Sequence, residues 1–147
     1  DWADLLLVAP LSAHTLAKLS NGFCDDTLSC VIRAWDYGHG VRPGKPLLLA
    51  PAMNTAMWEH PLTQLQLRTI QGFWNSSQQL PSSLPIKQAA RTAAGASLSC
   101  KRNKVRIISP QVKVLACGEV GNGALASVDE ILKVCQSFKN TQHVGSL

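Results

Sequence analysis

The chain has 147 residues, a hydrophobic fraction of 46% and a net charge of +5 at neutral pH. This length suffices for one domain with its own core, and no apolar run approaches the roughly 20 residues of a membrane-spanning helix. The basic excess is concentrated in residues 87–106 without a recognised nucleic-acid motif, so we interpret it as a solvated loop. We therefore expect a globular domain that binds neither membrane nor nucleic acid.

The cysteines do not follow a metal-binding pattern. None forms a CxxC pair, and no histidine lies at zinc-ligand spacing from them, so we expect no metal site. An odd number of cysteines without a readable signal peptide predicts free thiols in a reducing cytoplasm. Because the chain opens at Asp1 directly before a strand-like run, we also expect a truncated start. The five cysteines are Cys24, Cys30, Cys100, Cys117 and Cys135.

The first part of the chain reads as a strand followed by two helices. Residues 4–9 (DLLLVA) form a continuous apolar run, typical of a parallel strand buried on both faces, and Pro10 is expected to end it. Ser12 can cap the helix that follows. A second helix is expected to begin at Asp25 or Asp26.

A Gly/Pro loop at residues 37–45 leads into a second strand-and-helix unit. Residues 46–50 (PLLLA) predict another buried strand, and Asn54 or Thr55 can cap the helix after it. A proline inside that helical pattern predicts a break near His60.

The rest of the chain changes character. Residues 71–104 are rich in Ser, Gln, Ala and basic residues, and their apolar residues follow neither helical nor strand periodicity. We therefore interpret this segment as an insertion that is largely disordered. Residues 105–109 resume a strand pattern, and residues 118–123 are expected to form a flexible glycine loop. Ser127 can cap a last helix over residues 128–138.

Strands followed by helices, twice over, predict an α/β fold with a parallel sheet in a single domain of residues 1–147. In such sheets ligands bind beyond the carboxyl ends of the strands. Residues 12–15 and 52–54 directly follow the two predicted strands. The sequence therefore predicts that these two segments meet in one crevice.

Residues 9–16 (APLSAHTL) and 51–58 (PAMNTAMW) have side chains suited to that crevice. The first segment puts hydroxyls and free backbone N–H groups at a helix N-terminus, which suits a phosphate or a polar ring edge. In the second, Asn54 offers two donors and an acceptor, which suits a carboxylate. Helix capping alone is the alternative for both segments.

A third segment, residues 115–124 (LACGEVGNGA), places Cys117 ahead of three glycines. Glycines let a backbone fold closely over a ligand, and a mobile flap can carry a thiol to a substrate. A turn with an incidental buried cysteine is the alternative.

In order, the three segments resemble the PxSANT, PxMNxxMW and ACGxxGxG motifs of the homo-oligomeric flavin-containing Cys decarboxylases. Residues 24–36 (CDDTLSCVIRAWD) are similar to the phosphopantothenoylcysteine decarboxylase branch of that family. The likeness covers residues 2–70 and 105–135. It implies a Rossmann-like, flavodoxin-like three-layer fold, incomplete here at its N-terminus.

The resemblance also implies an activity. Family members use FMN to decarboxylate 4′-phosphopantothenoylcysteine to 4′-phosphopantetheine in coenzyme A biosynthesis, and this chain is expected to do so in a cytoplasmic homotrimer. By position, Asn54 would hold the substrate carboxylate and Cys117 would donate a proton to the enethiol intermediate. The residues expected to contact FMN are Ser12, Ala13, His14, Thr15 and Ala52.

Two departures from the family pattern leave an alternative open. His14 stands where the family usually has Asn, and the family's catalytic histidine lies upstream of the first motif, outside this chain. Some relatives have lost active-site residues and regulate protein phosphatases instead. His14 favours that alternative, whereas Asn54 and Cys117 oppose it.

Overall fold

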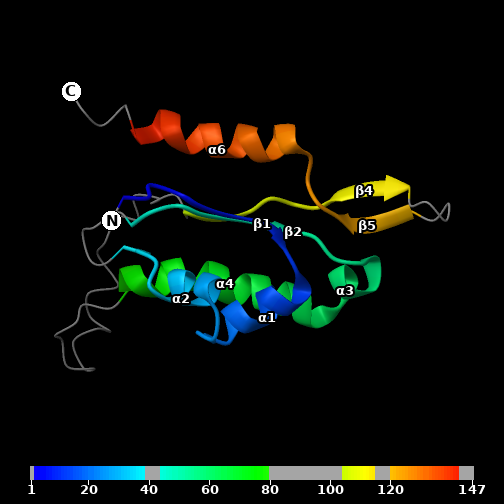
Figure 1. The fold of residues 1–147 in the computed structure, drawn as a ribbon, viewed down its shortest axis with the longest axis horizontal. Helices are drawn as coiled ribbons and strands as arrows, with labels where there is room; N and C mark the ends of the chain where they lie inside the picture. The colour runs from blue at the N-terminus through cyan, green and yellow to red at the C-terminus, as the bar shows by residue number, and fades with distance from the viewer. Residues whose placement is uncertain (1, 39–43, 80–103, 115–119, 143–147) are drawn as a thin grey trace, which may run out of the picture.

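A three-stranded parallel sheet forms the middle layer of the structure, in the order β1-β2-β3. The structure is a computed structural model that describes residues 2–38, 44–79, 104–114 and 120–142 (Figure 1). Leu6 of β1 pairs with Leu47 of β2, which pairs in turn with Val105 of β3. The strands span Leu6–Leu11 (β1), Leu47–Pro51 (β2) and Val105–Ile107 (β3).

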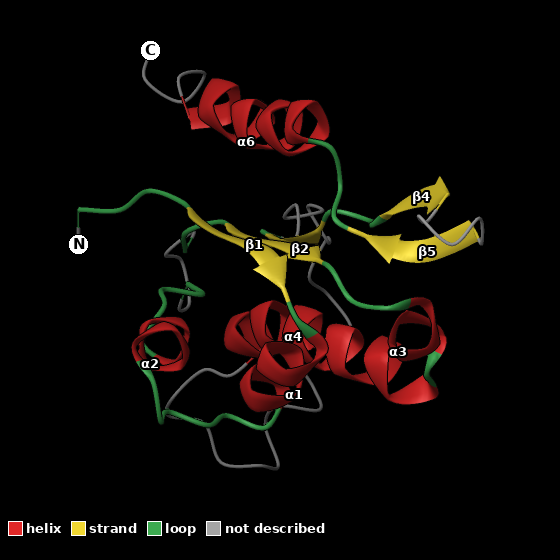
Figure 2. Cartoon of the chain, turned by 45° about the vertical axis from the view of Figure 1, so that its right-hand side comes forward, coloured by secondary structure: helices red, strands yellow, loops and turns green. Residues whose placement is uncertain are grey.

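Helices cover both faces of this sheet. One helix lies alone on one face, and three pack on the other, as Figures 1 and 2 show from two directions. A short helix, α3 (Thr55–Glu59), lies beyond the carboxyl end of β2. The predicted three-layer α/β fold with a parallel sheet is confirmed. The lone helix is α6 (Val128–Gln142), and the other three are α1 (Ala13–Ser20), α2 (Thr27–Arg33) and α4 (Pro61–Gln79).

The central strand β2 divides the core into two halves. Leu47 and Leu49 pack into the cluster formed with α1, α2 and α4, whereas Leu48 and Ala50 pack into the cluster formed with α6. All four side chains are fully buried. This explains why β2 reads as an unbroken apolar run, because alternate residues of a strand face opposite layers.

The helix starts agree with the sequence. Ser12, Asp26 and Asn54 are the N-caps of α1, α2 and α3, and each side chain accepts a hydrogen bond from a backbone N–H in the first turn. The predicted break lies at His60, whose extended backbone separates α3 from α4.

Two boundaries differ from the prediction. Strand β1 continues through Pro10 to Leu11, with an irregularity in its pairing after Val8. Helix α4 runs to Gln79, so residues 71–79 are helical and the predicted disorder is wrong for them. Buried Ile70 and half-buried Phe73 extend the apolar side of that helix into a segment whose composition is otherwise polar. Residues 80–103 lie outside the described residues, and their disorder stays a prediction.

A hairpin replaces part of the predicted glycine loop. Strand β4 (Gln111–Val114) pairs antiparallel with β5 (Val120–Ala124), and Val114 pairs with Val120. The expectation of a flexible loop is therefore wrong for residues 120–123. Helix α6 begins after Ser127, as predicted, and ends four residues later than expected. Within the described part of the chain, no helix combines the length and apolarity required to span a membrane.

Candidate active site

The turn after β1 is built as a capped helix start. The Ser12 Oγ accepts a hydrogen bond from the Thr15 N–H at 3.1 Å and lies 3.0 Å from the Thr15 Oγ1. The N–H groups of Ala13 and His14 belong to the first turn and have no acceptor among the described residues. The Ser12 side chain therefore caps the helix, while the backbone still offers two donors.

The turn after β2 is capped in the same way. The Asn54 Oδ1 accepts a hydrogen bond from the Met57 N–H at 2.9 Å, and Trp58 N–H donates to the Asn54 carbonyl at 3.0 Å. The Asn54 Nδ2 makes no hydrogen bond within the described ranges, and the side chain is exposed. Asn54 therefore serves as a cap through its oxygen and keeps two N–H donors for another group.

The two turns lie side by side. The Ala52 N–H donates to the Leu11 carbonyl at 2.9 Å, which joins the end of β2 to the end of β1. A groove of about 450 Å³ opens next to this junction, and both Ala13 and Asn54 line it. The predicted convergence is confirmed for these two residues. Ser12, His14, Thr15 and Ala52 lie in the same two turns but are not among the described lining residues.

The groove has a mainly apolar lining with a few polar side chains. Three alanines line it, Ala13 and Ala17 from α1 and Ala56 from α3, together with the apolar side chains of Met57 and Leu62. The polar groups are amide, hydroxyl and imidazole, and its described lining contains no carboxylate, lysine or arginine. A mainly apolar lining with a few polar groups is typical of sites that bind small molecules.

Three polar lining residues were not predicted as site residues from the sequence, namely His60, Thr63 and Gln66. His60 ends α3, and its Nδ1 accepts a hydrogen bond from the Leu62 N–H at 3.2 Å. Thr63 is almost fully buried and its hydroxyl donates to the Met57 carbonyl. These residues closely follow the PxMNxxMW segment in the chain, and this closeness was the one sequence feature that could have indicated their place at the site.

Hydrogen bonds join the hairpin to the Asn54 turn and to helix α3. The Met53 N–H donates to the Gly123 carbonyl at 2.9 Å, and the Asn122 N–H donates to the Thr55 hydroxyl at 3.2 Å. The Asn122 side chain also donates to the Glu59 carboxylate at 3.0 Å. Cys117 falls in residues 115–119, between β4 and β5 in the chain, and lies outside the described residues. Its predicted position in the crevice stays a prediction.

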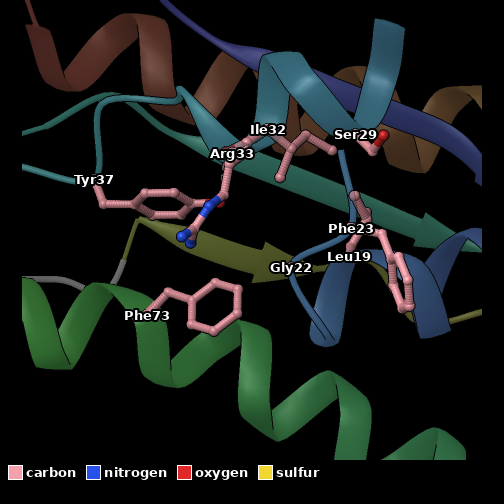
Figure 3. A pocket seen from close by; sticks show the side chains of 8 residues that line it. All are labelled: Leu19, Gly22, Phe23, Ser29, Ile32, Arg33, Tyr37 and Phe73. Atoms are coloured by element: carbon pink, nitrogen blue, oxygen red, sulfur yellow. Dashed lines mark hydrogen bonds between the residues drawn. The ribbon is translucent and has the colours of Figure 1, made fainter. Parts of the chain in front are cut away.

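A second cavity, of about 250 Å³, contains none of the predicted site residues. It lies between α1, α2 and the middle of α4, with Phe23 on one side and Tyr37 and Phe73 on the other (Figure 3). The rings of Tyr37 and Phe73 meet edge to face, with 6.0 Å between their centroids. No cluster of potential metal ligands occurs in the part of the chain that the structure describes.

A three-layer α/β fold with a groove at the strand ends is typical of proteins that bind a ligand beyond the carboxyl ends of a parallel sheet. The Flavoprotein family model matches residues 1–95, and the chain belongs to this family. A phosphopantothenoylcysteine decarboxylase of Mus musculus is 40% identical over 146 residues, which cover 99% of this chain and 53% of the relative. One of Arabidopsis thaliana is 38% identical, covering 96% of this chain and 50% of the relative.

Solved structures agree with these relatives. A cysteine-to-serine mutant of PPC decarboxylase complexed with pantothenoylaminoethenethiol superposes with a TM-score of 0.64 at 36% identity, covering 95% of this chain and 57% of that one. The FMN binding protein AtHal3 superposes with a TM-score of 0.61 at 36% identity, covering 95% of this chain and 56% of AtHal3. The chain spans about half the length of the curated relatives it matches.

Proposed function

We propose that this chain is part of an FMN-dependent decarboxylase that converts 4′-phosphopantothenoylcysteine to 4′-phosphopantetheine in coenzyme A biosynthesis. The main support for this proposal is that the turns after β1 and β2 meet at one groove lined by Ala13 and Asn54. Each of these turns contains a segment that resembles a motif of the decarboxylase family. The decarboxylase names of the relatives support the same activity.

The residues at the groove fit FMN. The three alanines add little bulk to the groove, which leaves space there for a planar ring system. The N–H groups of Ala13 and His14 lack acceptors among the described residues, so they are available to a polar ring edge. When bound, FMN would supply the electron sink that decarboxylation needs and that side chains lack. The residues that would hold it are Ser12, Ala13, His14, Thr15 and Ala52.

Asn54 is suited to orient the substrate. Its Oδ1 is fixed by the helix cap, so the Nδ2 is held in place and can donate to the carboxylate that will be lost. The absence of acidic side chains from the described lining leaves that carboxylate without like-charge repulsion there.

Cys117 is assigned the proton that completes the reaction. We propose that, after CO₂ has left, its thiol protonates the enethiol carbon, while the two electrons that the bound cofactor would take up during the oxidation return to the substrate. Its place in the chain supports this role, because β5, which follows it, is hydrogen-bonded to the Asn54 turn. The complex of a cysteine-to-serine PPC decarboxylase mutant with an aminoethenethiol compound supports it further.

The same proposal includes a homotrimer in the cytoplasm. Three large apolar side chains of α3 and α4, Met57, Leu62 and Leu65, are each more than half exposed, and an apolar surface of this kind suits a subunit contact. Light scattering measures the assembly state directly. If the full-length protein is strictly monomeric at micromolar concentration, this part of the proposal is wrong.

A chimaera tests the activity. In it, these 147 residues replace the matching segment of the Mus musculus relative, which supplies the remaining half of the relative's length. The purified chimaera is expected to be yellow and to form 4′-phosphopantetheine, detected by mass spectrometry, whereas the chain alone is expected to bind FMN more weakly. Ala13→Trp, which fills the groove, should remove both colour and product. A folded chimaera that neither binds FMN nor forms product would refute the proposed function.

A further inference from the structure

Two cysteines lie next to each other in the segment that joins α1 to α2. Cys24 lies two residues before the N-cap of α2, and Cys30 lies in the helix itself. The Cys30 Sγ–H donates to the Cys24 carbonyl oxygen at 3.4 Å, and the Cys24 Sγ–H donates to the Gly22 carbonyl oxygen at 3.7 Å. Both side chains are exposed, and both thiols are free.

The fold fixes the segment between these thiols. The Lys18 ammonium group contacts the carboxylates of both Asp25 and Asp26, the former at 2.6 Å. Asp26 also caps α2, since its carboxylate accepts from the Ser29 N–H at 2.8 Å while the Ser29 hydroxyl accepts from the Asp26 N–H at 3.1 Å. Asp25, Asp26 and Ser29 lie between Cys24 and Cys30 in the chain, so these contacts fix the segment that holds the two cysteines near each other.

We propose that Cys24 and Cys30 form a reversible disulfide, a redox modification site separate from the groove at the strand ends. The oxidant is a low-molecular-weight disulfide such as oxidised glutathione. One cysteine thiolate attacks it and releases one glutathione thiol, and the second cysteine attacks the protein sulfur of the mixed disulfide and releases the other. The two protein thiols lose two electrons and two protons, which the two glutathione thiols gain.

The disulfide would constrain one wall of the smaller cavity. Phe23 precedes Cys24 and Ser29 precedes Cys30, and both line that cavity together with Gly22 (Figure 3). None of these residues lines the groove that contains Ala13 and Asn54. The proposal therefore stands independently of the decarboxylase activity.

Tryptic mapping gives a direct test on the unmodified chain. Cleavage after Lys18 and Arg33 places both cysteines in the single peptide 19–33, whereas Cys135 lies in peptide 134–139. The chain is equilibrated in glutathione buffers of graded ratio, quenched in acid and alkylated. We expect peptide 19–33 to lose two hydrogens and resist alkylation, while Cys135 remains alkylated as an internal comparison.

The same equilibrium measured in urea separates the role of the fold from that of short sequence spacing. The equilibrium constant for disulfide formation should be at least tenfold larger in the folded chain than in the urea-unfolded chain. This factor corresponds to a difference of about 30 mV in reduction potential for a two-electron couple. Cys24→Ser and Cys30→Ser should each abolish the bridge, and Cys135→Ser should leave it unchanged. An equal or smaller constant in the folded chain, or separate glutathione adducts on the two cysteines, would overturn the proposal.

Discussion

The Gly123 carbonyl accepts a hydrogen bond from the Met53 N–H at 2.9 Å, and the two backbones are so close that a side chain at Gly123 has no room. A Cβ built there would lie 2.0 Å from the Met53 carbonyl oxygen and 3.2 Å from that of Asn54. Both contacts are with backbone, which cannot rotate away as a side chain could. Gly123 is therefore required for the hairpin to pack against the turn that carries Asn54.

We predict that Gly123→Ala lowers the free energy of unfolding by about 1–3 kcal/mol, the usual cost of forcing extra volume into a packed site. Gly72→Ala is the matched control, because a Cβ at Gly72 meets nothing within 4 Å and alanine is favoured inside a helix. This control should gain about 0.5–1 kcal/mol. Urea denaturation of both variants measures the two changes, and equal effects of the two substitutions would contradict the geometry at Gly123.

The sequence predicted the sheet and most helices because their signals are local. The unbroken apolar run at residues 47–50 and the caps at Ser12 and Asn54 depend on near neighbours in the chain. The convergence of Ala13 and Asn54 also followed, because the carboxyl ends of parallel strands meet at one edge.

What the sequence failed to predict depends on contacts between distant residues. The glycines at positions 121 and 123 read as a loop, yet they form a strand because Met53 and Thr55 provide hydrogen bonds to that segment. Residues 71–79 likewise read as polar insertion, whereas burial of the preceding Ile70 and packing of Phe73 against the core extend the helix.

Tyr37 gives a pH prediction that spectroscopy can isolate, because it is the only tyrosine in the chain. Burial raises its pKa to about 12, against a smaller lowering by the charge of Arg33. The unfolded chain therefore loses this proton near pH 10 while the folded chain keeps it, so stability should fall as the pH rises from about 10 to about 12.

Ultraviolet titration of the phenolate band tests this shift, with the same titration in urea as the reference. The folded protein should ionise at the higher pH. Phe73→Leu, which removes the ring that meets Tyr37 edge to face, should bring the two titrations closer together. Coincident curves for the wild-type protein would contradict the raised pKa of the half-buried Tyr37.

Two substitutions separate the capping role of Asn54 from its proposed role in binding. Asn54→Asp retains an oxygen for the Met57 N–H, so stability should stay within about 0.5 kcal/mol, but it places a carboxylate against the substrate carboxylate. In the chimaera it should abolish substrate binding and CO₂ release. Asn54→Ala removes the cap and should cost about 1 kcal/mol of stability. Normal CO₂ release by the Asp variant would exclude Asn54 as the carboxylate-binding residue.

The role proposed for Cys117 predicts a block at one defined step. In the chimaera, Cys117→Ser should still bind substrate and release CO₂, because neither event uses this proton. The final protonation should slow several hundred-fold, which corresponds to roughly 3 to 4 kcal/mol of barrier. Rapid-quench mass spectrometry should then detect the enethiol in place of 4′-phosphopantetheine. Cys135→Ser, at a half-buried cysteine of α6, is the control and should react at the wild-type rate. If Cys117→Ser forms 4′-phosphopantetheine equally fast, another group must deliver the proton and the cysteine has no part in the chemistry.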